Sequence, residues 1–389
     1  MKTVIVSGAI ANKLLNGGAT WTRLSWLLGL RKLGFRVFFI EHISQRACVD
    51  PDGGPCTFAW SANMHYFRRV MSSFGLDDAS ALIYEGGRQI HGSTWNNLLE
   101  IARSAELLVN ISGHLDLEPL KSPIGRKIYI DVDPGFTQLW HASGDHAPRL
   151  AGHDLYYTVG ANIGQPDCTI PTGDIPWRPI RQPVLLDEWP VCRDAPRNRF
   201  TTIASWRGAF GPVQHGGKSL GPKAHEFRAF VELPKRIDAD ATFEIALDIH
   251  PGDQKDLDLL RQNGWRVVDP KTVAGDPHLF RQYIQTSAAE FSVAQAMYVH
   301  TRSGWFSDRT VRYLACGRPA LVQDTGFSDL LPVGRGLLAF RTIDEAAAGA
   351  DDIVDHYEEH ASAAREIAER HFDSERVLSQ FCEQVGIEP

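Results

Sequence analysis

The chain has 389 residues, of which 43% are hydrophobic and 22% are charged, an ordinary globular composition that allows two domains of roughly 150–200 residues each. Its net charge of −7 argues against a nucleic-acid-binding surface, which requires a clustered basic excess. The six cysteines lack metal-ligand spacing, and no stretch approaches the roughly 18 apolar residues of a membrane span, so we expect a cytoplasmic protein with no integral membrane segment and no bound metal.

The first half of the chain alternates short β-branched runs with helical spacing. A helix is predicted over 19–34; it follows a glycine-bearing loop and ends at Gly34. This succession of strand, helix and strand indicates a parallel sheet covered by helices. The strands are predicted over 3–8, 35–42, 106–113, 127–135 and 154–160.

A proline-dense segment over 161–198 has no sustained period and is predicted to be a linker or an extended edge segment. The alternation then restarts, so the sequence predicts two successive α/β domains. Ligands of doubly wound domains bind at the carboxyl ends of the strands, and two facing domains place a cleft there. Strands are predicted over 200–208, 241–250, 265–270, 289–295 and 319–326, and helices over 223–236, 254–264, 277–287 and 343–387.

The stretch SGWFSDRTVRYLACGRP, residues 303–319, sets a polar cluster before an apolar helix. Ser307 or Asp308 is a natural N-cap, and Gly317 suits the end of the helix. Read only as structure, this is a capped crossover helix. The free N–H groups at its start also suit a phosphate, and Arg309 in the first turn, which the helix dipole disfavours, would be useful beside a diphosphate.

The second candidate is the glycine-rich loop over 201–227, which lies between a predicted strand and a helix. It carries Arg207, Lys218 and Lys223, and such loops bring backbone N–H groups and cations to phosphates. It is not a Walker A loop, because Lys218 comes one residue too late. The alternative is a surface loop with solvated lysines.

The N-terminal half supplies candidates for proton transfer. His114 follows a strand end and has the pKa range of a general base, although a lone histidine is more often structural. Asp131 and Asp133 point the same way because they are two residues apart, and they suit a base, a metal pair or a plain turn. Gly17 and Gly18 either let the chain approach a ligand or form a simple turn capped by Thr20.

The segment over 308–340 carries a helix that ends in Ala-Cys-Gly-x-Pro, then a strand, a small polar turn and a glycine-containing hairpin. It is similar to the nucleotide-sugar-binding region of the GT-B glycosyltransferases. The resemblance covers about 200–370 and, in the N-terminal half, only the strand–Gly-Gly–helix opening. It implies an α/β protein of two Rossmann-like doubly wound domains facing across a cleft. These would be an acceptor domain over 1–185, a donor domain over 186–365, and a C-terminal helix over 366–389 that returns to the first domain.

In that superfamily the nucleotide diphosphate lies on the second domain. The donor contacts that the resemblance implies are Ser205, Trp206, Arg207, Lys223, Ser307, Asp308, Arg309, Thr325 and Gly326, with Gly17 and Gly18 facing them from the first domain.

The chain departs from the superfamily pattern at two positions. Many retaining members carry two glutamates around the start of this helix, and the equivalent residues here are Gly304 and Arg312. Asp308 or Glu290 is the candidate replacement.

The resemblance implies transfer of a sugar from a nucleotide-diphosphate sugar to a hydroxyl of a small-molecule or glycan acceptor, by a hexosyltransferase-type enzyme that uses no cofactor or metal. Cationic side chains would stabilise the leaving diphosphate. In an inverting enzyme, His114 or Asp133 would be the base, and Trp21, Trp60, Trp95 and Trp140 are candidates for stacking on the acceptor. The alternatives are a nucleotide-sugar epimerase of the same architecture and a non-catalytic nucleotide-sugar-binding protein.

Overall fold

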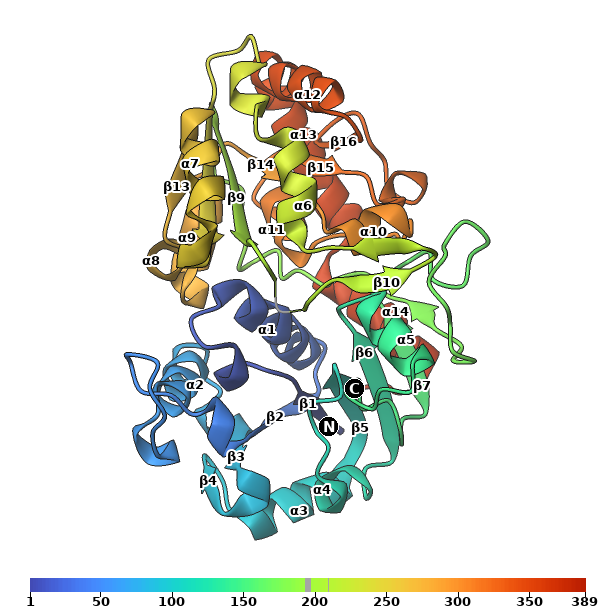
Figure 1. Ribbon diagram of the computed structural model, residues 1–389. Coiled ribbons are helices and arrows are strands. Elements are labelled where there is room, and N and C mark those ends of the chain that lie inside the picture. Colours follow the sequence, from blue (N-terminus) through green and yellow to red (C-terminus); the bar gives the residue numbers. More distant parts are fainter. Residues whose placement is uncertain (193–196, 209) are drawn as a thin grey trace.

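The computed structural model describes residues 1–192, 197–208 and 210–389; residues 193–196 of the predicted linker and residue 209 of the glycine-rich loop lie outside this part. Two α/β domains face each other, with the N-terminal domain below and the C-terminal domain above in Figure 1. Among the described residues, none of the helices is both long enough and apolar enough to cross a membrane.

The N-terminal sheet has the strand order β4-β3-β2-β1-β5-β6-β7-β8, and every pairing is parallel except that of β3 with β4. From β3 to β7 this is the 3-2-1-4-5-6 order of a doubly wound dinucleotide-binding domain. The strands are β1 (Thr3–Ser7), β2 (Arg36–Ile43), β3 (Ser80–Tyr84), β4 (Gln89–His91), β5 (Ala105–Ile111), β6 (Arg126–Asp131), β7 (Leu155–Thr158) and β8 (Arg178–Pro179). The helices are α1 (Gly17–Lys32), α2 (Ala62–Ser73), α3 (Trp95–Ser104), α4 (Glu118–Lys121) and α5 (Phe136–Ala142).

The C-terminal sheet repeats that order as β13-β12-β9-β14-β15-β16, all parallel, and a separate hairpin joins β10 to β11. Its strands are β9 (Arg199–Ser205), β12 (Thr242–Asp248), β13 (Trp265–Val268), β14 (Ala289–Ser292), β15 (Ala320–Gln323) and β16 (Leu337–Phe340), and the hairpin comprises β10 (Val213–His215) and β11 (Lys218–Leu220). The helices are α6 (Lys223–Phe227), α7 (Gln254–Gln262), α8 (Pro270–Ala274), α9 (Pro277–Gln285), α10 (Ala296–His300), α11 (Asp308–Ala315), α12 (Ile343–Asp355), α13 (Tyr357–His371) and α14 (Ser374–Val385).

The centre of the molecule is built around α1. This helix is buried on all sides from Thr20 to Leu30, because the N-terminal sheet covers one face and α9 and α14 cover others. A Cβ at Gly29 would collide with a methyl group of Leu378 of α14, so a larger residue here would require Leu378 to move. The predominantly apolar composition of α1 between Thr20 and Leu30 therefore reflects its position between two domains.

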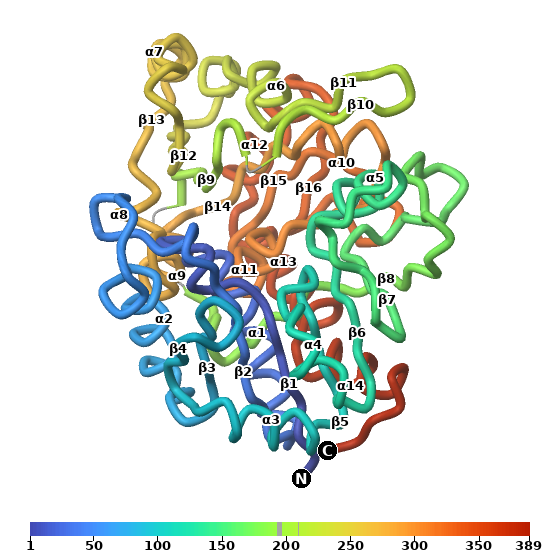
Figure 2. Tube along the Cα trace, turned by 60° about the horizontal axis from the view of Figure 1, so that its bottom comes forward, coloured from blue at the N-terminus to red at the C-terminus, as the bar shows by residue number. Residues whose placement is uncertain are grey.

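The chain crosses between the domains twice. The linker leads from β8 to β9, and after α13 the chain returns, pairing Val184 with Phe372 and Ser374 through backbone hydrogen bonds. Helix α14 then packs on the first domain, with the rings of Trp26 and Phe381 at 5.1 Å. The two chain ends consequently lie side by side in the N-terminal domain (Figures 1 and 2).

The predicted α/β class is confirmed, and several local predictions are corrected. The segment after β15 is not a hairpin, because β16 lies parallel to β15. The helix predicted over 223–236 is only α6, followed by separate 3-10 turns over Arg228–Phe230 and Leu233–Lys235. The prediction that the tail over 343–387 is helical is confirmed, with α12 to α14 filling it. Asn16, not Thr20, caps α1 by accepting a hydrogen bond from the N–H of Ala19.

Candidate active site

The carboxyl ends of the two sheets meet at the domain boundary. Gly135, after β6, has a positive φ and lies so close to Met297, after β14, that a Cβ would approach its sulfur to 2.7 Å. Gly160, after β7, forms an isolated bridge with Trp305. Residues that follow strands in both domains therefore share one region, as expected for two doubly wound domains.

The N-terminus of α11 lies in this region. The Oγ of Ser307 accepts a hydrogen bond from the N–H of Arg309 at 3.2 Å, as predicted for an N-cap. One carboxylate oxygen of Asp308 accepts from the hydroxyl of Thr22 and from the guanidinium of Arg312, each at 2.8 Å. Because Thr22 belongs to α1, Asp308 joins the two domains.

Arg309 is held on three sides inside the C-terminal domain. Its guanidinium donates to Glu290 Oε1 at 2.6 Å, to the carbonyl of Ile203 at 2.7 Å and to the hydroxyl of Ser292 at 2.8 Å. The side chain is 12% exposed and that of Glu290 is fully buried. Arg309 thus fastens α11 to the carboxyl ends of β9 and β14, and its contacts are structural in this state.

Lys223, at the start of α6, completes this cluster of Lys223, Glu290 and Arg309. Its ammonium donates to the carbonyl of Val293, just beyond β14, at 2.5 Å. Burial, and to a lesser degree the charge of Arg309, lowers the pKa of Lys223 to about 7. A lysine with such a pKa gains a proton readily when an anion arrives.

The N-terminal domain contributes a charged cluster of Lys13, Arg23, His114 and Asp133. Arg23 lies in the second turn of α1, is 5% exposed, and has an Nε without a partner among the described residues. Burial lowers its pKa, while Asp133, Glu41 and Asp308 act to raise it. The last of these belongs to α11, so the cluster faces the C-terminal domain.

The surroundings of the two predicted bases, His114 and Asp133, shift their pKa values in opposite directions. Burial and the charges of Arg23, Arg149 and Lys13 lower the pKa of His114 to about 3, so its ring is neutral and a weak proton acceptor. Burial raises the pKa of Asp133, against the opposing effect of Lys13 and Arg23. No described residue donates a hydrogen bond to the carboxylate of Asp133 or to the ring of His114. Asp131, by contrast, is fully used by Thr137, Gln138 and Thr158.

The loop between β1 and α1 is braced by the buried carboxylate of Glu41. One oxygen accepts from the N–H groups of Ile10 and Ala11, at 2.9 and 2.8 Å, and the other accepts from the backbone and side-chain N–H groups of Asn12. This loop supplies Lys13, so Glu41 sets the shape of one wall of the site.

We expect Glu41→Gln to lower the free energy of unfolding by about 1–3 kcal/mol, because either orientation of the amide sets an NH₂ group against two N–H donors. Urea unfolding followed by circular dichroism measures this loss. Glu100→Gln, at an exposed position of α3, is the control and should change little. If both variants are equally stable, the carboxylate of Glu41 does not stabilise the loop between β1 and α1.

Three predicted donor residues, Ser205 to Arg207, stand at the carboxyl end of β9. Their contacts are with residues at the end of β12 and in the segment that follows it. The hydroxyl of Ser205 donates to Asp248 at 3.2 Å, and the indole of Trp206 donates to Asp256 at 2.7 Å. Arg207 forms a bidentate pair with Asp253. Trp206 and Arg207 line a pocket of about 330 Å³ there.

The predicted glycines and Thr325 serve close packing. Gly17 and Gly18 lie against Phe280 of α9, where a Cβ would collide. Thr325 donates to the carbonyl of Trp305 at 2.6 Å, and the carbonyl of Gly326 accepts from Asn162 at 3.2 Å.

Arg312, at the position of a missing glutamate, points away from the C-terminal sheet. It is 2% exposed, contacts Asp308 and Ser25, and lies over the ring of Trp189 at 5.8 Å. Gly304, at the other position, has a φ of 69° and abuts Asn162. Neither position provides a carboxylate.

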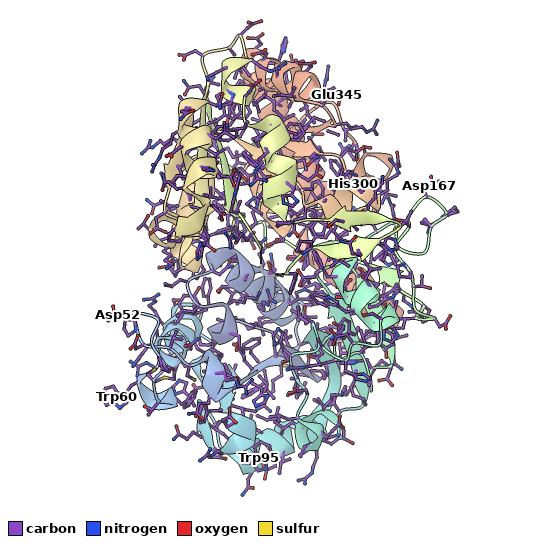
Figure 3. All side chains as sticks on the ribbon, in the orientation of Figure 1. Asp52, Trp60, Trp95, Asp167, His300 and Glu345 are labelled. Atoms are coloured by element: carbon purple, nitrogen blue, oxygen red, sulfur yellow. The ribbon has the colours of Figure 1, made fainter. Side chains whose placement is uncertain are left out.

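Of the tryptophans, Trp21 is buried at the domain interface, where its indole donates to the carbonyl of Pro277 at 2.7 Å. Trp140 packs edge-on against Phe210. Trp60 and Trp95 lie at the periphery of the N-terminal domain, remote from the C-terminal domain (Figure 3).

Sequence reasoning missed Lys13, Arg23 and Glu41. The last two carried a signal, since each is a charged residue within an otherwise apolar run, TRLSWLL and FFIEH. A buried charge requires a partner or a function.

Comparison with known proteins was made at the level of family and fold. The family described as "Glycosyl transferase-like" matches residues 263–384. No curated protein matches the sequence. Among solved structures, Anabaena Alr3699/HepE in complex with UDP-glucose has a TM-score of 0.59 at 11% identity, covering 99% of this chain and 100% of its own.

Two further structures have similar scores. A glycosyltransferase from Rickettsia africae has a TM-score of 0.55 at 12% identity, covering 98% of this chain and 97% of its own. A Listeria monocytogenes protein, provisionally described as a UDP-N-acetylglucosamine 2-epimerase, has a TM-score of 0.52 at 11% identity, covering 99% and 97%. The chain therefore shares the GT-B fold of these structures along its whole length, and residues 263–384 match the glycosyl transferase-like family.

Proposed function

We propose that the protein transfers a hexose from a nucleoside-diphosphate sugar to an acceptor hydroxyl at the domain boundary. The observation that carries this proposal is the position of the α11 N-terminus and Lys223 at the carboxyl ends of β9 and β14, opposite the unpartnered carboxylate of Asp133. The family match of residues 263–384 supports the general reaction.

On the donor side, the diphosphate would lie against the free N–H groups of α11 and the ammonium of Lys223. Arg23 faces the same region from α1 and has an unpartnered Nε. These groups place positive charge where the departing diphosphate gains negative charge, which is how preorganised dipoles and cations lower the barrier. We assign charge compensation to side chains, with Arg309 acting as their support.

On the acceptor side, Asp133 would accept the proton of the attacking hydroxyl. A raised pKa makes a carboxylate a better base at neutral pH, whereas His114, with a pKa of about 3, is a poorer one. Asp133 also faces Asp308 of the donor domain, as the effect of that charge on its pKa indicates.

Incubation with a panel of UDP-, GDP- and dTDP-hexoses tests the proposal. We expect one nucleotide to raise the melting temperature, and its sugar form to release free nucleoside diphosphate, slowly by hydrolysis and faster once an acceptor is found. The proposal fails if none of these nucleotides shifts the melting temperature.

Lys223 makes nucleotide binding dependent on pH. Between pH 7 and 9, where the terminal phosphate is already ionised, we expect the affinity for the nucleoside diphosphate to fall by up to about tenfold per unit, because Lys223 must take up a proton on binding. Isothermal titration calorimetry should show this dependence in the wild type and in Lys218→Met, whose exposed lysine lies in the same loop. It should be absent in Lys223→Met; persistence there would contradict the assignment.

Epimerisation of the donor is the second candidate, favoured by the fold similarity to the Listeria protein. Proton NMR of the incubated nucleotide sugar distinguishes epimerisation from transfer. An epimerase would yield either an intact nucleotide sugar with one inverted carbon or a free sugar released by elimination. Tight binding without any turnover would indicate a non-catalytic binding protein.

A further inference from the structure

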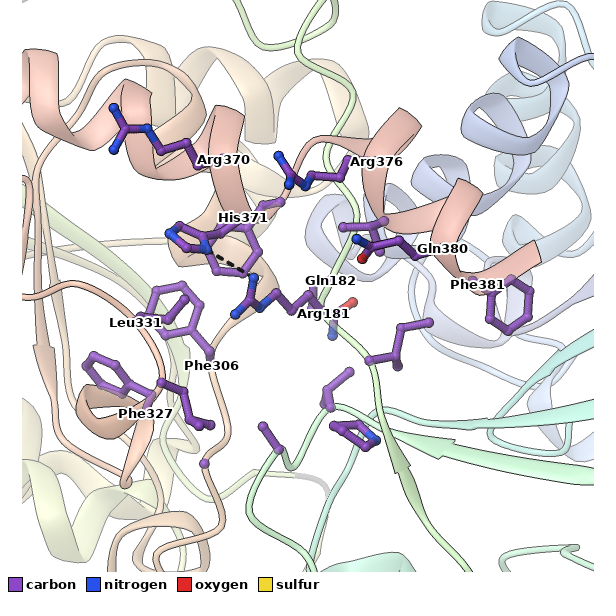
Figure 4. Close-up of a pocket in the computed structure, with 18 of the residues that line it drawn as sticks. Arg181, Gln182, Phe306, Phe327, Leu331, Arg370, His371, Arg376, Gln380 and Phe381 are labelled. Carbon is purple, nitrogen blue, oxygen red and sulfur yellow. Dashed lines mark hydrogen bonds between the residues drawn. The ribbon is translucent and has the colours of Figure 1, made fainter. Parts of the chain in front are cut away.

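A cavity of about 670 Å³ lies where the linker and the crossing helices meet, apart from the proposed donor and base residues (Figure 4). Its volume is in the range of small-molecule sites. Four parts of the chain form its walls: the segment after β7, the linker over 179–182, C-terminal-domain segments over 304–306 and 327–331, and the crossing region over 370–384.

Positive charge gathers on one side of this hinge cavity. A guanidinium nitrogen of Arg181 lies 3.0 Å from Nδ1 of His371, and Arg376 also lines the cavity. Burial and the neighbouring charges of Arg181, Arg376 and Arg370 lower the pKa of His371, and burial and Arg376 lower that of Arg181. Arg370 pairs with Glu366 at the surface. None of the described lining residues is acidic, so the charge of Arg181 and Arg376 is uncompensated.

An amide at the cavity wall forms no hydrogen bond with a described residue. Gln182 lines the wall and is 8% exposed, yet no described residue donates to or accepts from its carboxamide. An amide open to the cavity beside two arginines suits a ligand that carries oxygen atoms.

The other side of the cavity is apolar. Phe306, Phe327 and Leu331 lie opposite Gln380 and Phe381 (Figure 4), and the rings of Phe306 and Phe327 are 5.1 Å apart. Leu330 lines the cavity and is 45% exposed. The cavity is therefore amphipathic, with cations and an amide facing a hydrocarbon wall.

We propose that the hinge cavity binds an amphipathic organic anion, with a phosphate or carboxylate head on Arg181, Arg376 and Gln182 and an apolar group against Phe306, Phe327 and Leu331. Charge-assisted hydrogen bonds hold the head, and burial of the apolar group adds to the affinity. Because its walls come from both domains and from the chain that joins them, the bound anion fixes their relative position. The proposal does not depend on the transferase reaction.

Calorimetry with decyl phosphate below its micelle concentration tests this site. We expect one molecule to bind per chain, at least about tenfold more tightly than inorganic phosphate or decanol, since each supplies only half of the contacts. Inorganic phosphate binding as tightly as decyl phosphate would overturn the amphipathic site. Binding to anionic vesicles with none of the free amphiphile would show a membrane contact instead, and would also overturn it.

Leu330→Glu and Val333→Glu form a matched pair of variants. Both residues are exposed, at 45% and 43%, so neither change should unfold the protein, but only Leu330 lines the cavity. We expect Leu330→Glu to weaken decyl phosphate binding by about tenfold through charge repulsion, and Val333→Glu to leave it unchanged. Arg376→Ala should weaken it similarly, with Arg335→Ala as the control for an exposed arginine elsewhere. Unchanged affinity in Leu330→Glu and Arg376→Ala would refute the proposal.

Discussion

Arg309→Met should destabilise the C-terminal domain by about 3–5 kcal/mol, because it leaves the fully buried carboxylate of Glu290 without its cation. It also removes the hydrogen bonds from α11 to Ile203 and Ser292. Adding Glu290→Gln should restore part of the loss, since the remaining amide carries no charge. Urea unfolding of both single variants and of the double variant measures the coupling.

Arg266→Met is the matched control for this experiment. Arg266 pairs with the buried Glu244 at 3.0 Å, but Glu244 keeps a second partner in Arg199 at 2.9 Å. The control should therefore lose no more than about 1 kcal/mol. If Arg309→Met and the double variant are equally unstable, the charge of Glu290 is not the cause. Loss of nucleotide binding in an Arg309 variant is informative only where the domain remains folded.

Asp133→Asn should lower the rate of sugar transfer by about 10²–10⁴-fold, the usual contribution of a general base. The variant should fold normally. Since burial raises the pKa of Asp133, its ionised form is less favourable in the folded than in the unfolded chain at neutral pH, and a neutral side chain of the same shape removes that cost. The transfer rate and the melting temperature together check both statements.

Two further variants are measured beside Asp133→Asn to test whether its effect on the transfer rate is specific. Asp167→Asn, in an exposed loop far from the site, should leave the rate unchanged (Figure 3). His114→Gln should have a smaller effect than Asp133→Asn, because a pKa of about 3 makes the ring a weak acceptor. A full rate in Asp133→Asn combined with a lost rate in His114→Gln would reverse the assignment. Full rates in both would exclude a base from this pair.

Much of the fold could be predicted because its signals are local. Short runs such as TVIVS and ALVQ are buried on both faces, so their apolar composition marks parallel strands. The cap at Ser307 and the end of α1 before Gly34 depend only on neighbouring residues. The short hairpin of β10 and β11 and the edge strand β4 were not predicted, because a strand of three residues is too short to show a period.

The sequence by itself determined the α/β class, the two successive domains and the polar start of α11, since periodicity and capping are properties of adjacent residues. Only the tertiary structure decided what each charged side chain does. Arg309 meets Glu290 and Ile203, and Asp308 meets Thr22 of the other domain, through contacts between residues far apart in the chain. The same packing of distant segments brings Arg23 beside Asp133 and builds the hinge cavity. Partners of this kind depend on how the domains meet, and no local pattern records that.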